Sequence, residues 1–241
     1  MQDEIRKHSK KAISIMKNSE HSAVEKIKEI GIEIFIIVFA VSFSIWLHSW
    51  SEHRHQQEEV KEFLTDLKED LKGDIESQIE ARKVYLKTIE SFNYIINLSE
   101  KQYDNLSGAK DSISFKSNLS TKMSSFPNVW LKSRSGNYEG FKSSGKIGFI
   151  ENKKLKKLIL EYYEQAMPAA AIQDEYSRQM TMKTSEIISD IDGNGKKIIF
   201  NKKVQTNLQT IIQMSNSSIK NYQNITKLSQ DILEEIDKYT I

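Results

Sequence analysis

One run of apolar residues limits what this chain can fold into. From Ile30 to Trp50 the sequence reads IGIEIFIIVFAVSFSIWLHSW, and the part from Ile34 to Leu47 contains no charged residue. A membrane-spanning helix needs roughly 20 mostly apolar residues to cross about 30 Å of hydrocarbon. A buried helix of a soluble domain would show a polar stripe, whereas this run is apolar around its whole circumference. We therefore predict a transmembrane helix over residues 30–50.

A cleaved signal peptide is the main alternative to a permanent span. Its apolar core would be about 7 to 15 residues long and would end at small residues suited to cleavage. Here the run ends in Trp46, His48 and Trp50, and no such pattern follows it. Indole rings favour the lipid headgroup region, which is where Trp46 and Trp50 would lie. We expect the segment to remain in the chain.

The flanking charges predict the orientation of this span. Lys and Arg next to a span are retained on the cytoplasmic side. After the span the basic residues are mixed with many Asp and Glu. The basic residues before it are Arg6, Lys7, Lys10, Lys11, Lys17, Lys26 and Lys28. We predict a single-pass protein of the cell inner membrane with a cytoplasmic tail (residues 1–29) and a periplasmic, or more generally extracytoplasmic, domain (residues 51–241).

The rest of the sequence favours an all-α domain. Only 2 prolines and 9 glycines occur in 241 residues, so few residues interrupt helices. After the span, apolar residues recur at steps of three or four, and after a gap the series resumes: Val60, Leu64, Leu67, Leu71, Ile75 and Ile79, then Leu86, Ile89, Phe92 or Tyr94, and Ile96. Similar patterns cover residues 151–189 and 203–239. We expect the membrane helix to continue into an antiparallel bundle of about three to four long helices. The alternative for the near-heptad stripe is a coiled coil between chains.

Composition excludes several functions. The formal net charge of +2 is too balanced for a dedicated nucleic-acid binder. The absence of cysteine excludes disulfides, thiolate metal sites and cysteine nucleophiles. Residues 190–195 (DIDGNG) resemble the front of a calcium loop, but Asn201 replaces its closing glutamate, and a plain turn explains the residues equally well. We expect His48, His53 and His55 to be solvated, with a metal or pH-sensing role as the alternative. We predict no catalytic, cofactor or metal site.

An aromatic, glycine-rich connection is the most unusual part of the domain. Trp130, Tyr138, Phe141 and Phe149 lie among glycines between the predicted helices. Such a composition favours a compact packed loop. The alternative is an interaction surface formed by these four rings, because binding residues gather on loops held by rigid scaffolds. An enzyme site within residues 126–150 is a further alternative, although no spaced acid, base and nucleophile are present.

Polar residues in the apolar run point to assembly. Glu33 lies near its inner end, and Ser42 and Ser44 lie in its middle. Small and polar residues let membrane helices approach and hydrogen-bond to each other. Glu33 is alternatively a residue at headgroup depth beside Lys26 and Lys28. From these features we predict a homo-oligomer.

Several blocks resemble an uncharacterised bacterial family of single-pass membrane proteins, a domain of unknown function. The span opens with Gly31 and Glu33 and leaves through Ser49-Trp50-Ser51-Glu52, which partly matches the Gly-Glu opening and Asn-Trp-Asn-Glu exit of that family. The segment EFLTDLKEDLKGD resembles its Leu-x-x-Leu-x-x-Asp-Leu helix. The residues that resemble its second block are Ser144, Gly145, Lys146, Ile150, Leu155, Tyr162 and Tyr163. The resemblance implies the same topology and a helical domain, and it implies no activity.

Together these features predict a membrane-anchored helical binding or scaffold protein without catalytic activity. We expect it to contact the lipid bilayer and either copies of itself or other envelope proteins, as an accessory subunit of an envelope complex. A membrane-anchored sensor domain is the nearest alternative.

Overall fold

The computed structural model describes residues 2–17, 23–129, 133–192 and 195–239, and they divide into two compact units. The first unit extends to Glu59 and the second begins at Val60. The first contains α1 (Gln2–Lys17) and the beginning of α2 (Ala23–Ile96), and the second contains the rest of α2. The α2 helix includes a stretch that is long and apolar enough to cross a membrane, and little of this stretch is buried. A signal sequence near the N-terminus would meet the same criteria.

All regular secondary structure among the described residues of the second unit is helical, which confirms the all-α prediction. Its short helices precede and separate two further long ones. In chain order after α2 these elements are α3 (Glu100–Gly108), α4 (Ser112–Met123), α5 (Gly136–Ser143), the 3-10 helix η1 (Lys146–Phe149), α6 (Lys153–Glu161), the π-helical turn η2 (Tyr162–Ala166), α7 (Met167–Ser189), α8 (Gly195–Ile199) and α9 (Lys202–Tyr239).

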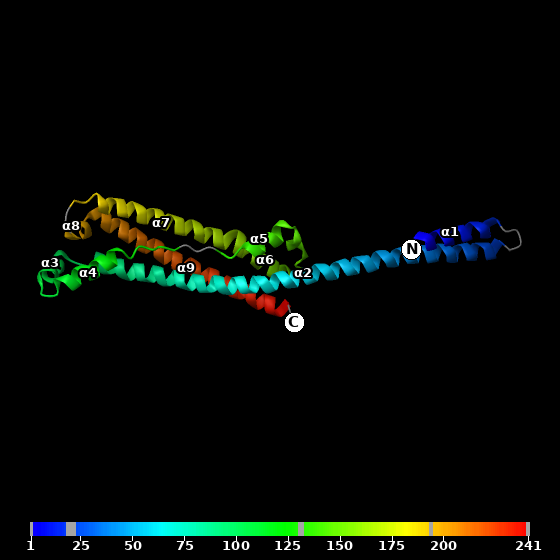
Figure 1. Cartoon of the computed structure of the whole chain (residues 1–241), viewed down its shortest axis with the longest axis horizontal. Helices are drawn as coiled ribbons and strands as arrows, with labels where there is room; N and C mark the ends of the chain where they lie inside the picture. The colour runs from blue at the N-terminus through cyan, green and yellow to red at the C-terminus, as the bar shows by residue number, and fades with distance from the viewer. Residues whose placement is uncertain (1, 18–22, 130–132, 193–194, 240–241) are drawn as a thin grey trace. The chain divides into compact units, whose positions relative to one another are not determined.

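Three long helices form the body of this unit: the second half of α2, α7 and α9 (Figure 1). The α9 helix runs antiparallel to α2, because Gln78 contacts Thr226 and, further along α2, Tyr85 contacts the earlier residue Tyr222. The α7 helix runs in the same direction as α2, since Gln78 contacts Tyr162 just before α7, and Tyr85 contacts Asp174 within it.

A continuous heptad pattern of buried residues runs through α2 from Val60 onward and through α9. Steps of four and three alternate without a break through both helices, as in coiled coils. In α2 the buried heptad positions are Val60, Leu64, Leu67, Leu71, Asp74, Gln78, Ala81, Tyr85, Thr88, Phe92 and Ile95, and Phe63 and Ser91 are buried beside this pattern. In α9 the buried heptad positions are Val204, Leu208, Ile211, Ser215, Ser218, Tyr222, Ile225, Ser229, Ile232 and Ile236, and Thr226 and Glu235 are buried beside this pattern. The apolar residues of the near-heptad stripe that are buried therefore pack within the helical bundle of a single chain.

The predicted stripe is wrong at Ile79 and Leu86. Ile79 is 36% exposed and Leu86 is 56% exposed, so neither lies in the core. The heptad positions beside them belong to Gln78 and Tyr85, whose polar atoms have hydrogen-bond partners inside the bundle. These polar residues can occupy the core because their polar atoms are hydrogen-bonded there. The neighbouring apolar residues, which hydrophobicity alone would place in the core, lie outside it.

Small hydroxyl side chains divide the core. One hydrophobic cluster includes Tyr85 and Tyr222, and another includes Phe92 and Ile211. Along α2 and α9 these clusters are separated by fully buried small residues, namely Thr88, Ser215 and Ser218, and Ser177 of α7 is buried as well. The middle of the bundle is thus packed with small polar side chains.

The connection between α4 and α5 returns along α2 (Figure 1). Thr88 donates a hydrogen bond to the carbonyl oxygen of Ser125 at 2.8 Å. Toward the start of the unit, Asp74 contacts Ser133 and Asn137 donates to Asp70 at 2.8 Å. This return path places α7 parallel to α2, because the chain comes back before α6 and α7 begin.

Candidate functional site

The buried carboxylate of Asp74 is the centre of the most extensive polar cluster. Asp74 is only 2% exposed. Its Oδ1 accepts a hydrogen bond from the backbone N–H of Arg134 at 3.1 Å. Its Oδ2 accepts from the hydroxyls of Tyr162 at 2.8 Å and Ser133 at 3.1 Å. These bonds compensate the cost of burying the carboxylate. They also attach the aromatic connection to α2.

Gly73 provides the space that this attachment needs. The guanidinium of Arg134 lies over the bare backbone of α2 at this glycine. A Cβ placed at position 73 would be only 2.2 Å from Cζ of Arg134. Any other residue would therefore displace that side chain. Glycine lowers the stability of a helix through its conformational freedom. The close approach of Arg134 explains why α2 nevertheless has a glycine at position 73.

The π-helical turn η2 brings two consecutive tyrosines into the core. Tyr162 and Tyr163 are both buried, and their ring centroids lie 4.8 Å apart. The hydroxyl of Tyr162 donates to Asp74 and accepts from Nε2 of Gln78 at 3.1 Å. Oε1 of Gln78 in turn accepts from Thr226 at 2.9 Å. Burial, reinforced by Asp74, raises the pKa of Tyr162 well above its usual value, so the phenol stays a proton donor.

The chain continues from this turn directly into α7. Pro168 falls in the first turn of α7, where its missing N–H leaves no bond unmade. The π-helical turn accommodates the change of register between α6 and α7.

A second polar cluster joins all three long helices. The Asp174 carboxylate of α7 accepts hydrogen bonds from Tyr85 of α2 at 2.7 Å and from Tyr222 of α9. Burial raises the pKa of Asp174, and the two phenol hydroxyls act in the opposite direction. Both oxygens of this carboxylate are engaged, so the cluster ties the helices together.

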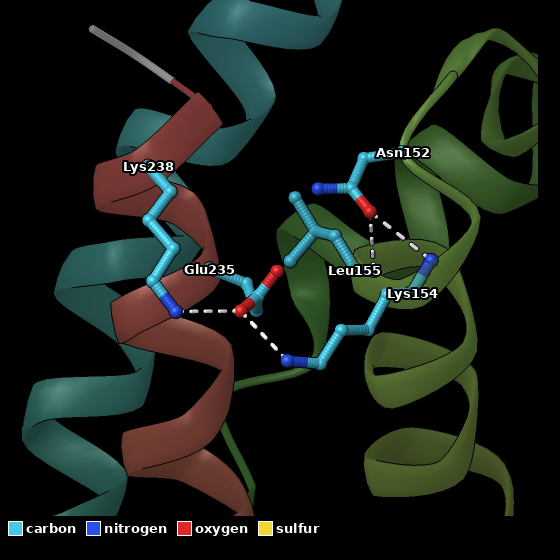
Figure 2. Close-up of polar contacts among 5 residues, drawn as sticks. All are labelled: Asn152, Lys154, Leu155, Glu235 and Lys238. Carbon is cyan, nitrogen blue, oxygen red and sulfur yellow. Dashed lines mark hydrogen bonds and ion pairs between the residues drawn. The ribbon is translucent and has the colours of Figure 1, made fainter.

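A third cluster lies where the beginning of α6 meets the end of α9 (Figure 2). Asn152 caps α6, because its Oδ1 accepts from the backbone N–H groups of Lys154 and Leu155 at 3.0 Å each. Glu235 of α9 is bonded by two ammonium groups, those of Lys154 and Lys238, each at 2.8 Å. These bonds lower the pKa of Glu235 to about 2.

This shift predicts a pH-dependent contribution to stability. The folded-state pKa of Glu235 is depressed, so its ion pairs stabilise the fold above the ordinary glutamate pKa of 4.5 and lose this effect as the pH falls toward about 2. We expect Glu235→Gln to lower the melting temperature at pH 7, and this difference from the parent protein to disappear by about pH 2. Thermal melts of the full chain followed by circular dichroism measure both.

The matched control is Glu234→Gln, because Glu234 is the exposed neighbour of Glu235 on α9. The control should melt like the parent protein over the whole pH range. A loss for Glu235→Gln that is the same at pH 7 and pH 2 would show that the ion pairs are not its cause.

The aromatic residues predicted as an interaction surface are placed as follows. Trp130 lies outside the described residues. Tyr138 is 0% exposed and stacks on Tyr163 with ring centroids 4.2 Å apart. Phe141 is 8% exposed and stacks on Phe63 at 4.1 Å. Phe149 is half-buried against the same cluster. Tyr138 and Phe141 therefore contribute to the core of the second unit, as packing of the connection requires.

The residues predicted for assembly lie in the first unit, but they do not all share one face of α2. Glu33 is 4% exposed, and its carboxylate contacts Nδ1 of His8 at 2.6 Å and Nζ of Lys11 at 2.9 Å. Its partners are thus on α1 of the same chain. Ser44 is eleven residues from Glu33, so both lie on one face of α2, whereas Ser42 is displaced from Ser44 by two residues and lies on another.

The described residues contain no group of three His, Cys, Asp or Glu side chains placed to hold a metal ion. In the turn that resembles a calcium loop, Asp190 is the C-cap residue of α7. Residues 193–194 of this turn lie outside the described residues. Lys196 follows them and pairs with Asp104 at 2.7 Å. His48 and His55 are exposed and lie near Glu52 and Glu59 at 4.0 and 3.6 Å.

A cavity of about 910 Å³ opens between α3, α4, α7 and α8. Tyr103, Leu119 and Ile199 provide buried apolar lining, and serines and one lysine provide the polar lining. Sequence reasoning placed its only candidate pocket within residues 126–150. This cavity could not be found from spacing, since its walls come from four separate segments.

Comparison with known families assigns the chain. Residues 33–217, which are more than half of the chain, match the sequence profile of a family of unknown function, DUF6090. The chain belongs to the DUF6090 family. No curated protein and no solved structure matches it. The family assignment agrees with the resemblance, because both point to a domain of unknown function. The assignment gives neither a membrane topology nor an activity.

The DUF6090 match includes Asp74, Tyr162 and Asp174 and ends before Tyr222, Thr226 and Glu235. Sequence reasoning missed Asp74, Gln78 and Asp174 as structural residues. The sequence feature that could have identified them is the alternating spacing of four and three residues. This spacing continues through the polar positions, whereas the apolar residues beside them do not follow it.

Proposed function

We propose that this DUF6090 protein is a membrane-anchored helical scaffold that associates with itself through its span and presents its helical domain outside the cytoplasm. The observation that carries the proposal is the exposed apolar surface of α2. Phe35, Phe39, Phe43 and Trp46 form a ladder of stacked rings along the helix, with centroid separations of 6.1, 5.9 and 5.8 Å. All four side chains are exposed. An apolar surface of this length is suited to lipid.

The charged groups of the domain favour binding over catalysis. A general acid or base needs a pKa near the working pH and access to a substrate. Bonds from Lys142 and Tyr138 lower the pKa of Glu164, and lysines lower that of Glu235. Asp174 has a raised pKa, but two tyrosines occupy its oxygens. These carboxylates are used to hold helices together.

The face of α2 opposite the aromatic ladder supports self-association. Glu33, Ile37, Ala40 and Ser44 follow one another at helical spacing and share a face. Ala40 and Ser44 are small residues four apart, an arrangement that lets membrane helices approach closely. Because His8 and Lys11 engage Glu33, we place the contact between chains at Ala40 and Ser44.

Single cysteines test both parts of the proposal, since the chain has no cysteine of its own. A membrane-impermeant maleimide added to spheroplasts should label Lys220→Cys in the domain, and should label Lys10→Cys in the tail only after permeabilisation. The reverse pattern would overturn the orientation. In the same membranes, oxidation should crosslink Val41→Cys, beside the small-residue face, and not Phe39→Cys on the aromatic ladder. Monomer at both positions would end the self-association proposal.

A further inference from the structure

The cavity between α3, α4, α7 and α8 has the size and lining of a ligand site. Its volume of about 910 Å³ falls in the range of roughly 300 to 1,000 Å³ that is common for small-molecule sites. The apolar lining includes Leu119, Met123, Ile188 and Ile199. Such a surface favours a hydrocarbon chain, because burying apolar area is the main driving force for association in a pocket of this kind.

The serine hydroxyl groups that line the cavity can accept hydrogen bonds from a ligand. Ser185 and Ser189 each donate to the carbonyl oxygen four residues earlier, at 3.0 Å, and Ser107 and Ser124 also donate to backbone carbonyls. A hydroxyl whose proton is used in this way keeps its lone pairs for another donor. The rim therefore suits a ligand that carries free hydroxyl groups.

Lys116 gives the cavity its charge. It is the lining residue with a full charge at neutral pH, it is exposed, and no carboxylate of the described residues pairs with it. On neighbouring α3, Glu100 and Asp104 are both paired with Lys196, at 3.6 and 2.7 Å. The ammonium of Lys116 is therefore available to a negatively charged group.

We propose that this cavity binds a single-chain anionic lipid with a hydroxylated headgroup. The hydrocarbon chain packs on Leu119, Met123 and Ile188, the anionic group contacts Lys116, and the headgroup hydroxyls donate to the serines. The site belongs wholly to the second unit, so the proposal does not depend on the membrane anchor or on self-association.

The test uses the full chain in nanodiscs of phosphatidylcholine and a lysophosphatidylglycerol probe with a photoreactive group at the end of its chain. Irradiation should label peptides that contain Met123 or Ile188. Lys116→Gln should weaken binding about tenfold, as expected for the loss of one charge-assisted bond. Lys110→Gln, an exposed lysine that does not line the cavity, should have no effect. Ser189→Trp should block labelling by filling the cavity.

Lysophosphatidylcholine is the matched neutral probe. It should bind more weakly than lysophosphatidylglycerol, and Lys116→Gln should not change its affinity. Label confined to the apolar span, or label that persists in Ser189→Trp, would overturn the site. Equal binding of both probes, or an unchanged affinity of Lys116→Gln for the anionic probe, would overturn the assignment of an anionic lipid.

Discussion

Replacing Asp74 with alanine is expected to lower the free energy of unfolding by about 3 kcal/mol. The substitution removes the acceptor of three hydrogen bonds, from Tyr162, Ser133 and the backbone of Arg134. Each buried donor without an acceptor costs about 1 to 3 kcal/mol, and the sum is not additive. Relief from burying a carboxylate offsets part of the loss. Thermal and denaturant unfolding of the full chain in mild detergent, followed by circular dichroism, measures the change.

The matched control is Asp66→Ala on the same helix. Asp66 is exposed and has no hydrogen-bond partner among the described residues, so its replacement should change stability by less than about 0.5 kcal/mol. If both variants lose the same stability, helix propensity or net charge explains the result, and the buried bonds of Asp74 do not contribute as proposed.

The beginning of the bundle could be predicted from the sequence because hydrophobicity and burial agree there. Val60, Leu64, Leu67 and Leu71 are apolar, keep heptad spacing and are buried. The agreement ends at Asp74, whose hydrogen-bond donors lie 59 to 88 residues later in the chain. A local pattern contains no information about such partners, so it assigns Asp74 to the surface and follows Ile75 and Ile79 instead.

Other features depend on contacts that no local spacing encodes. Tyr162 and Tyr163 are both buried in the π-helical turn between α6 and α7, and no spacing of apolar residues marks that turn. The partners of Glu33 are on α1, which the sequence marked only as a basic tail. The aromatic connection could be recognised as unusual, but the residue opposite each ring could not be named.

Phe141→Ala is expected to be among the most destabilising single changes, with a loss of about 3 to 5 kcal/mol. The ring of Phe141 is nearly buried and lies parallel to that of Phe63, with an interplanar angle of 4°. Its removal leaves a cavity between α5 and α2 that rigid helices cannot fill. The melting temperature of the full chain measures the loss. The control is Ile113→Ala, since Ile113 is a large apolar residue that is exposed.

A double-mutant cycle separates this ring contact from the general cost of making a hole. Phe63→Ala, Phe141→Ala and the double variant are compared, and the two single losses should exceed the double loss by about 0.5 to 1.5 kcal/mol, the range for a stacked aromatic pair. Losses that simply add would mean that the rings do not interact. If Phe141→Ala instead leaves melting unchanged and abolishes binding of a partner, the connection is an interaction surface, and the core described for it is wrong. Because both residues lie within the second unit, the result does not depend on where the span is inserted.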